Sequence, residues 1–174
     1  MGARSILILA GVVLGAPLLA ACPQTPASAP KAPVDLAAPG MVAARKTFEC
    51  AGPANVVALR ATGVRHDKQW YEVPPGFTVF GFAVVDLGVT PPPSSRSQTF
   101  ASVKASPAAV LAAVKAAIPD ARVSSPGYPD DQIPANAGFY YISWGERTPG
   151  AQNPNQMNLQ SDGTEAGIVC HASW

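Results

Sequence analysis

FTVFGFAVVDL, residues 77–87, is the stretch that decides the fold of this chain. Its two alternating faces carry Phe77, Val79, Ala83 and Val85 on one side and Phe80, Phe82 and Val84 on the other. Because both faces are apolar, the pattern predicts a central strand that is covered on both sides. The preceding Pro74-Pro75-Gly76 predicts a tight turn, since proline fixes φ and glycine tolerates positive φ. We therefore expect a hairpin that links residues 70–73 to this strand.

A helix is predicted further along the chain. Ser106 followed by Pro107 is typical of an N-cap with proline at the first helical position. Apolar side chains then recur at helical spacing, at Val110, Leu111, Val114 and Ile118. The strand-like segments 99–104 and 121–124 flank this helix, which should end near Pro119. We expect a β-α-β arrangement whose strand pairing the sequence leaves open.

The remaining segments predict more strands. Residues 139–144, FYYISW, are aromatic and β-branched, as strands prefer. Residues 157–161 and 166–174, joined by Asp162-Gly163, are typical of a closing hairpin. The predicted fold class is therefore α+β, with a small, mostly antiparallel sheet and one main helix, residues 107–118, packed on one face.

The first residues resemble an export signal. Arg4 supplies a positive charge, and an apolar run of 16 residues follows at positions 6–21. A helix that crosses about 30 Å of hydrocarbon needs roughly 20 residues, so a permanent membrane span is the weaker interpretation. The run ends in Leu19-Ala20-Ala21-Cys22, which resembles the bacterial lipobox. The alternative is an ordinary secretory peptide, with Cys22 a chance thiol.

The lipobox resemblance implies a lipid-anchored protein of the cell envelope. Residues 1–21 would be removed and Cys22 would carry acyl chains, each buried CH₂ contributing about 0.8 kcal/mol to membrane attachment. In lipoproteins that resemble this one, Asp after the cysteine retains the protein at the inner membrane. Because the residue here is Pro23, the outer membrane is favoured.

Composition predicts a tether between the lipid and one domain. Residues 22–40 are rich in Pro and Ala, cannot bury enough apolar surface to order themselves, and would extend about 3.1 Å per residue. Residues 41–174 have the length of a single domain. The chain has 12 basic and 11 acidic side chains, and Arg45-Lys46 is its one adjacent basic pair. This balance argues against a nucleic-acid partner.

Two cysteines remain for the domain, Cys50 and Cys170. In an exported chain they are expected to form a disulfide that ties the first strand to the last. Closing a loop of about 120 residues would stabilise the fold by about 4–5 kcal/mol in the chain-entropy model. A catalytic or redox cysteine lacks support, because the chain has no Cys-x-x-Cys motif.

Candidate catalytic groups are few. His66-Asp67 and His171 lie in no catalytic or metal motif, and Asp130-Asp131 are adjacent carboxylates in a polar loop, where neighbouring side chains usually point apart. No Gly-x-Ser-x-Gly elbow and no phosphate-binding glycine loop is present in the sequence. We therefore expect a non-enzymatic protein without a metal or cofactor.

A protein-binding module is the favoured function, because polar loops on a rigid sheet are common recognition sites. Segments 124–138 and 145–155 carry the candidate binding residues Tyr128, Asn136, Arg147, Gln152 and Asn155. The expected partner is another envelope protein, in an assembly, scaffold or immunity role. The alternative is that these loops are only connections.

Two narrower functions stay open. Ala61-Thr62-Gly63-Val64-Arg65 loosely resembles the Ala-Ser-Gly loop with which lipid-anchored inhibitors of c-type lysozyme enter their target's cleft. That resemblance would imply an inhibitor of a cell-wall hydrolase. A protein that binds or hydrolyses the cell wall would instead line a groove with aromatic residues, for which the candidates are Trp70, Tyr71, Tyr140 and Tyr141. Most of these are expected in the core.

Overall fold

The fold is known from a computed structural model, which describes residues 33–51, 55–65, 70–90, 97–145, 155–162 and 164–172. Residues 1–21, Cys22 and most of the expected tether lie outside these ranges. The last part of that tether belongs to the folded unit, Pro33–Trp174, because helix α1 already begins at Pro39. The N–H of Ala37 donates to Oδ1 of Asp35 over 2.9 Å, and this turn leads into the helix.

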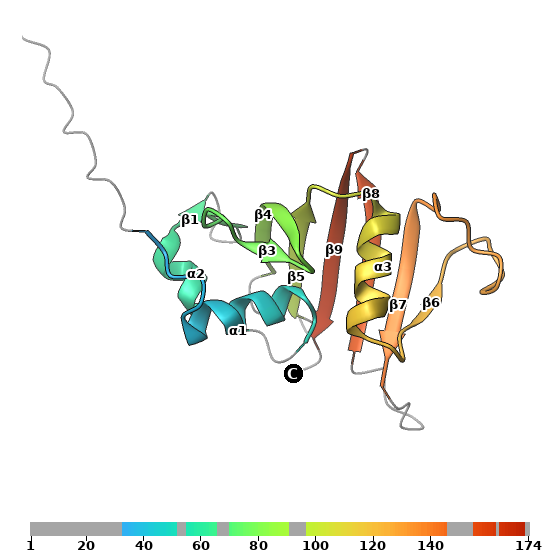
Figure 1. Cartoon of the computed structure of the whole chain (residues 1–174), viewed down its shortest axis with the longest axis horizontal. Helices are drawn as coiled ribbons and strands as arrows, with labels where there is room; N and C mark the ends of the chain where they lie inside the picture. Colours follow the sequence, from blue (N-terminus) through green and yellow to red (C-terminus); the bar gives the residue numbers. More distant parts are fainter. Residues whose placement is uncertain are drawn as a thin grey trace, which may run out of the picture. The chain divides into compact units, whose positions relative to one another are not determined.

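An antiparallel sheet forms the body of the fold, in the order β1-β2-β4-β5-β9-β8-β7-β6 (Figure 1). Its strands are β1 (Val64–Arg65), β2 (Trp70–Tyr71), β4 (Phe82–Val89), β5 (Ser97–Val103), β6 (Arg122–Ser124), β7 (Phe139–Trp144), β8 (Asn155–Asp162) and β9 (Glu165–Ala172). The short β3 (Thr78–Val79) pairs with β4 beside this path. The α+β prediction is confirmed, and so are the strand at 139–144 and the closing hairpin, β8 and β9.

Within the described ranges, three helices accompany the sheet: α1 (Pro39–Phe48), α2 (Val57–Thr62) and α3 (Pro107–Ala117). Helix α3 is the predicted one, and Ser106 caps it by accepting a hydrogen bond from the N–H of Ala109 over 3.3 Å. The sequence analysis did not predict α1 and α2. Helix α1 begins with proline in its first turn and buries Met41, Ala44 and Phe48 along one stripe.

The prediction of a single strand over residues 77–87 was wrong. The segment forms a tight hairpin, in which Thr78 pairs with Ala83 and Val79 with Phe82. Phe80 and Gly81 form its two-residue loop with φ of 49° and 81°, the backbone twist that joins antiparallel strands closely. The apolar run 77–87 therefore contains a turn that its hydrophobic pattern does not indicate. The expected turn at residues 74–77 is present, with a Phe77 N–H to Pro74 C=O bond of 3.0 Å, but β2 pairs with the far end of β4.

The two strands of the predicted β-α-β arrangement are not neighbours in the sheet, because three other strands lie between them. Helix α3 connects β5 to β6, and β9, β8 and β7 lie between these strands in the sheet. Strand β9 is therefore central, although it is the last described strand in the sequence. It pairs with β5 on one side and with β8 on the other along its whole length.

The core lies between the helices and one face of the sheet. Helix α3 contacts β8 and β9, and α1 contacts β5 and β9. The strand residues on this face form paired rows of buried side chains: Thr99, Cys170 and Met157 in one, and Ala101, Ile168, Leu159 and Tyr140 in the next. Val110 and Val114 of α3 are fully buried against the same cluster. The helices thus protect one face of the sheet from water.

Cys50 and Cys170 form the expected disulfide, with Cα atoms 5.3 Å apart and a sequence separation of 120 residues. The expectation that it ties the first strand to the last needs correction. Cys50 follows the C-terminus of α1, where it adopts φ of 57°, and Cys170 lies on β9. The disulfide therefore fastens α1 to the central strand of the sheet.

Candidate functional site

The face of the sheet opposite α1 and α3 is the candidate site, and we call it the open face. Its side chains alternate with the core residues along each strand, so they point away from the helices. They form three paired rows: Gln98, His171, Gln156 and Ser143; Phe100, Val169, Asn158 and Tyr141; and Ser102, Gly167, Gln160 and Phe139. All of these residues are half-buried or exposed.

The middle row extends to β2 on one side and to β6, an edge strand of the sheet, on the other. Trp70 pairs with Gly88, which pairs with Phe100, and at the far edge Tyr141 pairs with Ser124. The ring of Trp70 lies against the backbone of β4 at Gly88. A Cβ at Gly88 would come within 2.9 Å of this ring. Glycine at this position thus lets the indole rest on the strand. The row runs without interruption across seven strands of the sheet.

Aromatic rings stand at both ends of this row. The rings of Trp70 and Phe100 have centroids 6.5 Å apart, and those of Phe139 and Tyr141 meet edge to face at 4.7 Å. Trp70 is 36% exposed and Tyr141 is 50% exposed. Rings paired in this way keep a fixed orientation and cost little entropy when they bind a ligand.

His171 holds two amide side chains in place at the centre of the open face. Nε2 of Gln98 lies 3.2 Å from its Nδ1, and Nδ2 of Asn158 lies 2.9 Å from its Nε2. These residues come from β5, β8 and β9, three adjacent strands. Nearby, the hydroxyl of Ser102 donates to Oε2 of Glu165 over 2.8 Å. The polar groups of the face are therefore ordered before any ligand arrives.

A groove lies in the open face where β6, β7 and β8 run side by side. Its volume is about 370 Å³, and the open-face side chains along it are Ser124, Tyr141, Ser143, Gln156 and Asn158. This size is within the range of small-ligand sites, about 300–1,000 Å³. Its lining offers a ring, amides and hydroxyls, which suit recognition by stacking and hydrogen bonding.

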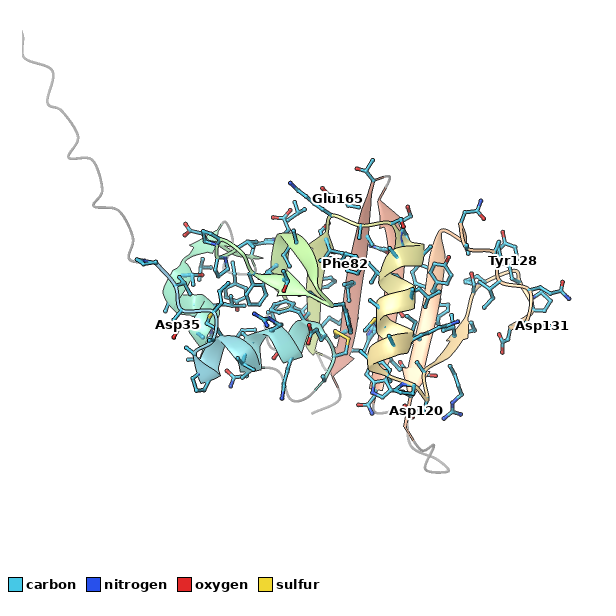
Figure 2. All side chains as sticks on the ribbon, in the orientation of Figure 1. Asp35, Phe82, Asp120, Tyr128, Asp131 and Glu165 are labelled. Carbon is cyan, nitrogen blue, oxygen red and sulfur yellow. A yellow bond between two sulfur atoms is a disulfide. The ribbon has the colours of Figure 1, made fainter. Side chains whose placement is uncertain are left out.

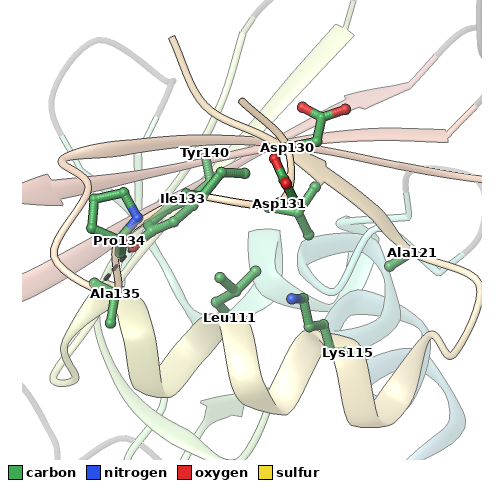
Figure 3. A pocket seen from close by; sticks show the side chains of 10 residues that line it. Leu111, Lys115, Ala121, Asp130, Asp131, Ile133, Pro134, Ala135 and Tyr140 are labelled. Carbon is green, nitrogen blue, oxygen red and sulfur yellow. Dashed lines mark hydrogen bonds between the residues drawn. The ribbon is translucent and has the colours of Figure 1, made fainter. Parts of the chain in front are cut away.

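A second pocket, of about 380 Å³, lies on the helix side, between α3 and the loop that precedes β7 (Figure 3). Lys115 of α3 and the adjacent Asp130 and Asp131 of the loop line it. These three side chains are exposed. The hydroxyl of Tyr140, at the base of the pocket, donates to the carbonyls of Ala135 over 2.9 Å and Pro134 over 3.2 Å. This hydroxyl is thus engaged in holding the loop.

Tyr140 gives a test of this structural role. Burial raises the pKa of its phenol from the ordinary value of 10.0, although a backbone hydrogen bond from Ala137 lowers it in part. The folded state then favours the protonated phenol, so its contribution to stability is complete below pH 10 and is lost as pH rises beyond 10. In denaturant titrations from about pH 8 to about pH 11, we expect stability to fall more steeply in the wild type than in Tyr140→Phe. Equal slopes for the wild type and Tyr140→Phe would contradict the assignment.

The structure does not bring the candidate binding residues together. Tyr128 and Asn136 lie in the loop before β7, whereas Asn155 pairs with Trp144 at the other end of that strand. A strand of this length separates its ends by about 17 Å. Figure 2 shows the same separation, with Tyr128 at one end and Asp120, whose carboxylate binds the N–H of Gly145 after β7, at the other. Arg147 and Gln152 lie outside the described residues, as do His66 and Asp67.

The segment that resembles an inhibitor loop is fastened to the sheet. Ala61 and Thr62 end α2, and the hydroxyl of Thr62 donates to the carbonyls of Leu59 over 2.8 Å and Glu72 over 3.1 Å. The carbonyl of Gly63 accepts from the N–H of Glu72 over 3.0 Å. A loop that enters an enzyme cleft must project from its own fold, so this geometry adds no support to the lysozyme-inhibitor resemblance.

Within the described ranges, no group of three or more His, Cys, Asp or Glu side chains could hold a metal ion. Likewise, none of the described helices is long and apolar enough to cross a membrane.

The sequence analysis selected loops and missed the open face. Most of the aromatic candidates were expected in the core, but only two of the four lie there: Tyr71 and Tyr140 are buried, while Trp70 and Tyr141 reach the surface. The polar alternation of Gln156, Asn158 and Gln160 was a signal of an exposed strand face, but strand order was needed to place it beside His171. The site rests on geometry alone, because the chain matches no family model, no curated protein and no solved structure.

Proposed function

We propose that this chain is a lipid-anchored protein of the bacterial cell envelope, whose folded unit is a non-catalytic binding module that uses the open face. The observation that carries the proposal is the row of paired residues across seven strands, with aromatic rings near both ends. An ordered surface of rings and amides can bind a partner by stacking and by hydrogen bonds. The anchor, on Cys22, would hold this surface close to its partner.

Binding is a better account of the open face than catalysis. Catalysis by side chains needs a nucleophile or base that is aimed at a substrate. Here both ring nitrogens of His171, the histidine in the described rows of the face, are occupied by Gln98 and Asn158. Amides and hydroxyls in fixed positions favour a role in which a partner is held unchanged.

The expected partner is another component of the envelope. The sequence analysis favoured a protein, in an assembly, scaffold or immunity role, and kept a cell-wall ligand as an alternative. The cell-wall ligand is favoured by the exposed aromatic residues on the open face, Trp70 and Tyr141. Pro23 after the lipidated cysteine favours the outer membrane as the location.

The anchor itself is tested with Cys22→Ala. We expect the wild-type chain to fractionate with membranes and to carry acyl chains on a new N-terminus at Cys22, because more than one buried acyl chain makes attachment lasting. The variant should lose the lipid and leave the membrane fraction. Mass spectrometry of the N-terminus provides the measurement. A wild-type chain without acyl groups would overturn this part of the proposal.

The binding surface is tested by placing a charge in the groove. Ser143→Lys introduces an ammonium group on the open face, whereas Gln132→Lys introduces one in the exposed loop before β7. Affinity capture of the full-length chain from its own envelope should recover a stoichiometric partner with the wild type and Gln132→Lys, and lose it with Ser143→Lys. Equal recovery with all three chains would contradict the assignment of the open face.

A further inference from the structure

We infer that the open face binds a neutral glycan strand of the cell wall, which stacks a sugar ring on Tyr141 and exchanges hydrogen bonds with the amides around His171. This inference rests on the proposed function and names the ligand class of the same surface. Three observations support it: the donors and acceptors of the face, its rings, and the uncharged side chains at its centre.

The hydrogen-bonding groups of the face match a polyhydroxylated ligand. Gln98, Gln156, Asn158 and Gln160 each carry both donors and an acceptor, as sugar hydroxyl and acetamido groups do. Gln98 and Asn158 are fixed by His171, so part of the entropy cost of binding is met in advance. Gln156 is exposed beside them and lines the groove. Such a set can pair with hydroxyl groups in either direction.

The rings supply the other half of sugar recognition. A pyranose ring presents C–H groups on its faces, and these groups pack against the negative face of an aromatic ring. Tyr141 is half exposed, and Phe139 meets it edge to face at 4.7 Å, which holds its ring in place. Tyr141 also lines the groove together with Ser143 and Asn158. A sugar placed there would contact a ring and amide groups at once.

The uncharged centre of the open face favours a neutral ligand over a polyanion. The central residues of the three rows carry no carboxylate, ammonium or guanidinium group. Charged side chains lie around this centre: Asp86 pairs with Ser102, Arg122 pairs with Ser143, and Glu165 accepts a hydrogen bond from Ser102. Nucleic acids and other polyanions need cationic groups, which the centre of the face does not supply. The described rows contain one aliphatic side chain, Val169, among amides, hydroxyls and rings. This composition suits a neutral, hydrogen-bonding partner.

The test is co-sedimentation of the full-length chain, in detergent micelles, with purified peptidoglycan sacculi that have been freed of bound protein. We expect the wild type to sediment with the sacculi. We also expect soluble oligomers of N-acetylglucosamine to release the protein from them. Tyr141→Ala should weaken binding about tenfold, since it removes a stacking ring. Tyr128→Ala is the matched control, because Tyr128 is 47% exposed but lies outside the open face. Gln156→Ala should weaken binding about threefold, and its control Gln132→Ala, in the exposed loop, should not.

Each opposite result has a defined meaning. If the folded wild type does not sediment with sacculi, or if Tyr141→Ala and Tyr128→Ala bind equally well, the glycan inference is overturned. If the wild type does not sediment with sacculi, but Ser143→Lys loses a protein partner that the wild type captures, the glycan inference is overturned. The proposal of a binding module is then supported. If substitutions on the open face change neither binding to sacculi nor recovery of a protein partner, both proposals are overturned.

Discussion

Replacing both Cys50 and Cys170 with alanine is expected to lower the free energy of unfolding by about 4–5 kcal/mol. The disulfide closes a loop with a sequence separation of 120 residues, so its removal returns a large conformational entropy to the unfolded chain. It also leaves the C-terminus of α1 without its covalent link to β9. Denaturant titration of the full-length chain in detergent, followed by tryptophan fluorescence, measures the change.

Reduction of the wild-type chain is the control for this substitution. It should reproduce most of the loss, because it breaks the same bond without changing side-chain volume. The double variant should show no further change under reducing conditions. A loss of less than about 1 kcal/mol in both experiments would mean that α1 is held by packing alone, and the entropic argument would be rejected.

Leu159→Ala should have the second largest effect, a loss of about 3 kcal/mol within the usual range for buried leucines. Leu159 is fully buried on β8, in the row that contains Ile168 and Tyr140, and α3 covers it. The shorter side chain leaves a cavity that the sheet cannot close, because its register is fixed on both sides of β8. Thermal or denaturant unfolding provides the measurement.

Gln156→Ala is the matched control in the same strand. Gln156 lies on the open face and is exposed, so its truncation should change stability by no more than about 0.5 kcal/mol. The contrast within one strand tests which face of the sheet is the core. Similar losses for the two variants would contradict the assignment of the helices to a single face.

Local signals gave the reliable part of the sequence prediction. Ser106 and Pro107 mark the start of α3 because capping depends on adjacent residues alone. The aromatic run at 139–144 and the hairpin after it are strands for the same reason, since alternation and turn chemistry are visible at short range. The fold class follows from these elements.

The errors have physical causes that a sequence pattern does not reveal. Phe80-Gly81 turns the chain inside an apolar run, because Phe80 adopts a positive φ that is uncommon for its residue type. Helix α1 was missed because its first residues, Pro39 and Gly40, continue a Pro-rich composition. Its buried stripe becomes meaningful only when the sheet beneath it is known.

The open face depends on strand order, which no local pattern encodes. Gln98 and His171 are 73 positions apart in sequence, and they meet because β9 lies between β5 and β8. The candidate loops, in contrast, were chosen for composition, and Tyr128 and Asn155 proved to lie near opposite ends of β7. Long-range pairing is therefore what the sequence analysis lacked.

The central position of β9 has a consequence for the order in which the sheet can be completed. Strands β1, β2, β4 and β5 form one half of the sheet and β8, β7 and β6 the other, and β9 joins them. During synthesis, β5 and β8 must therefore wait, each with an unpaired edge, until residues 165–172 arrive. Unpaired edges recruit strands from other chains. Aggregation of this protein should thus be decided in the interval before β9 is delivered, when a chaperone that shields strand edges would protect it most.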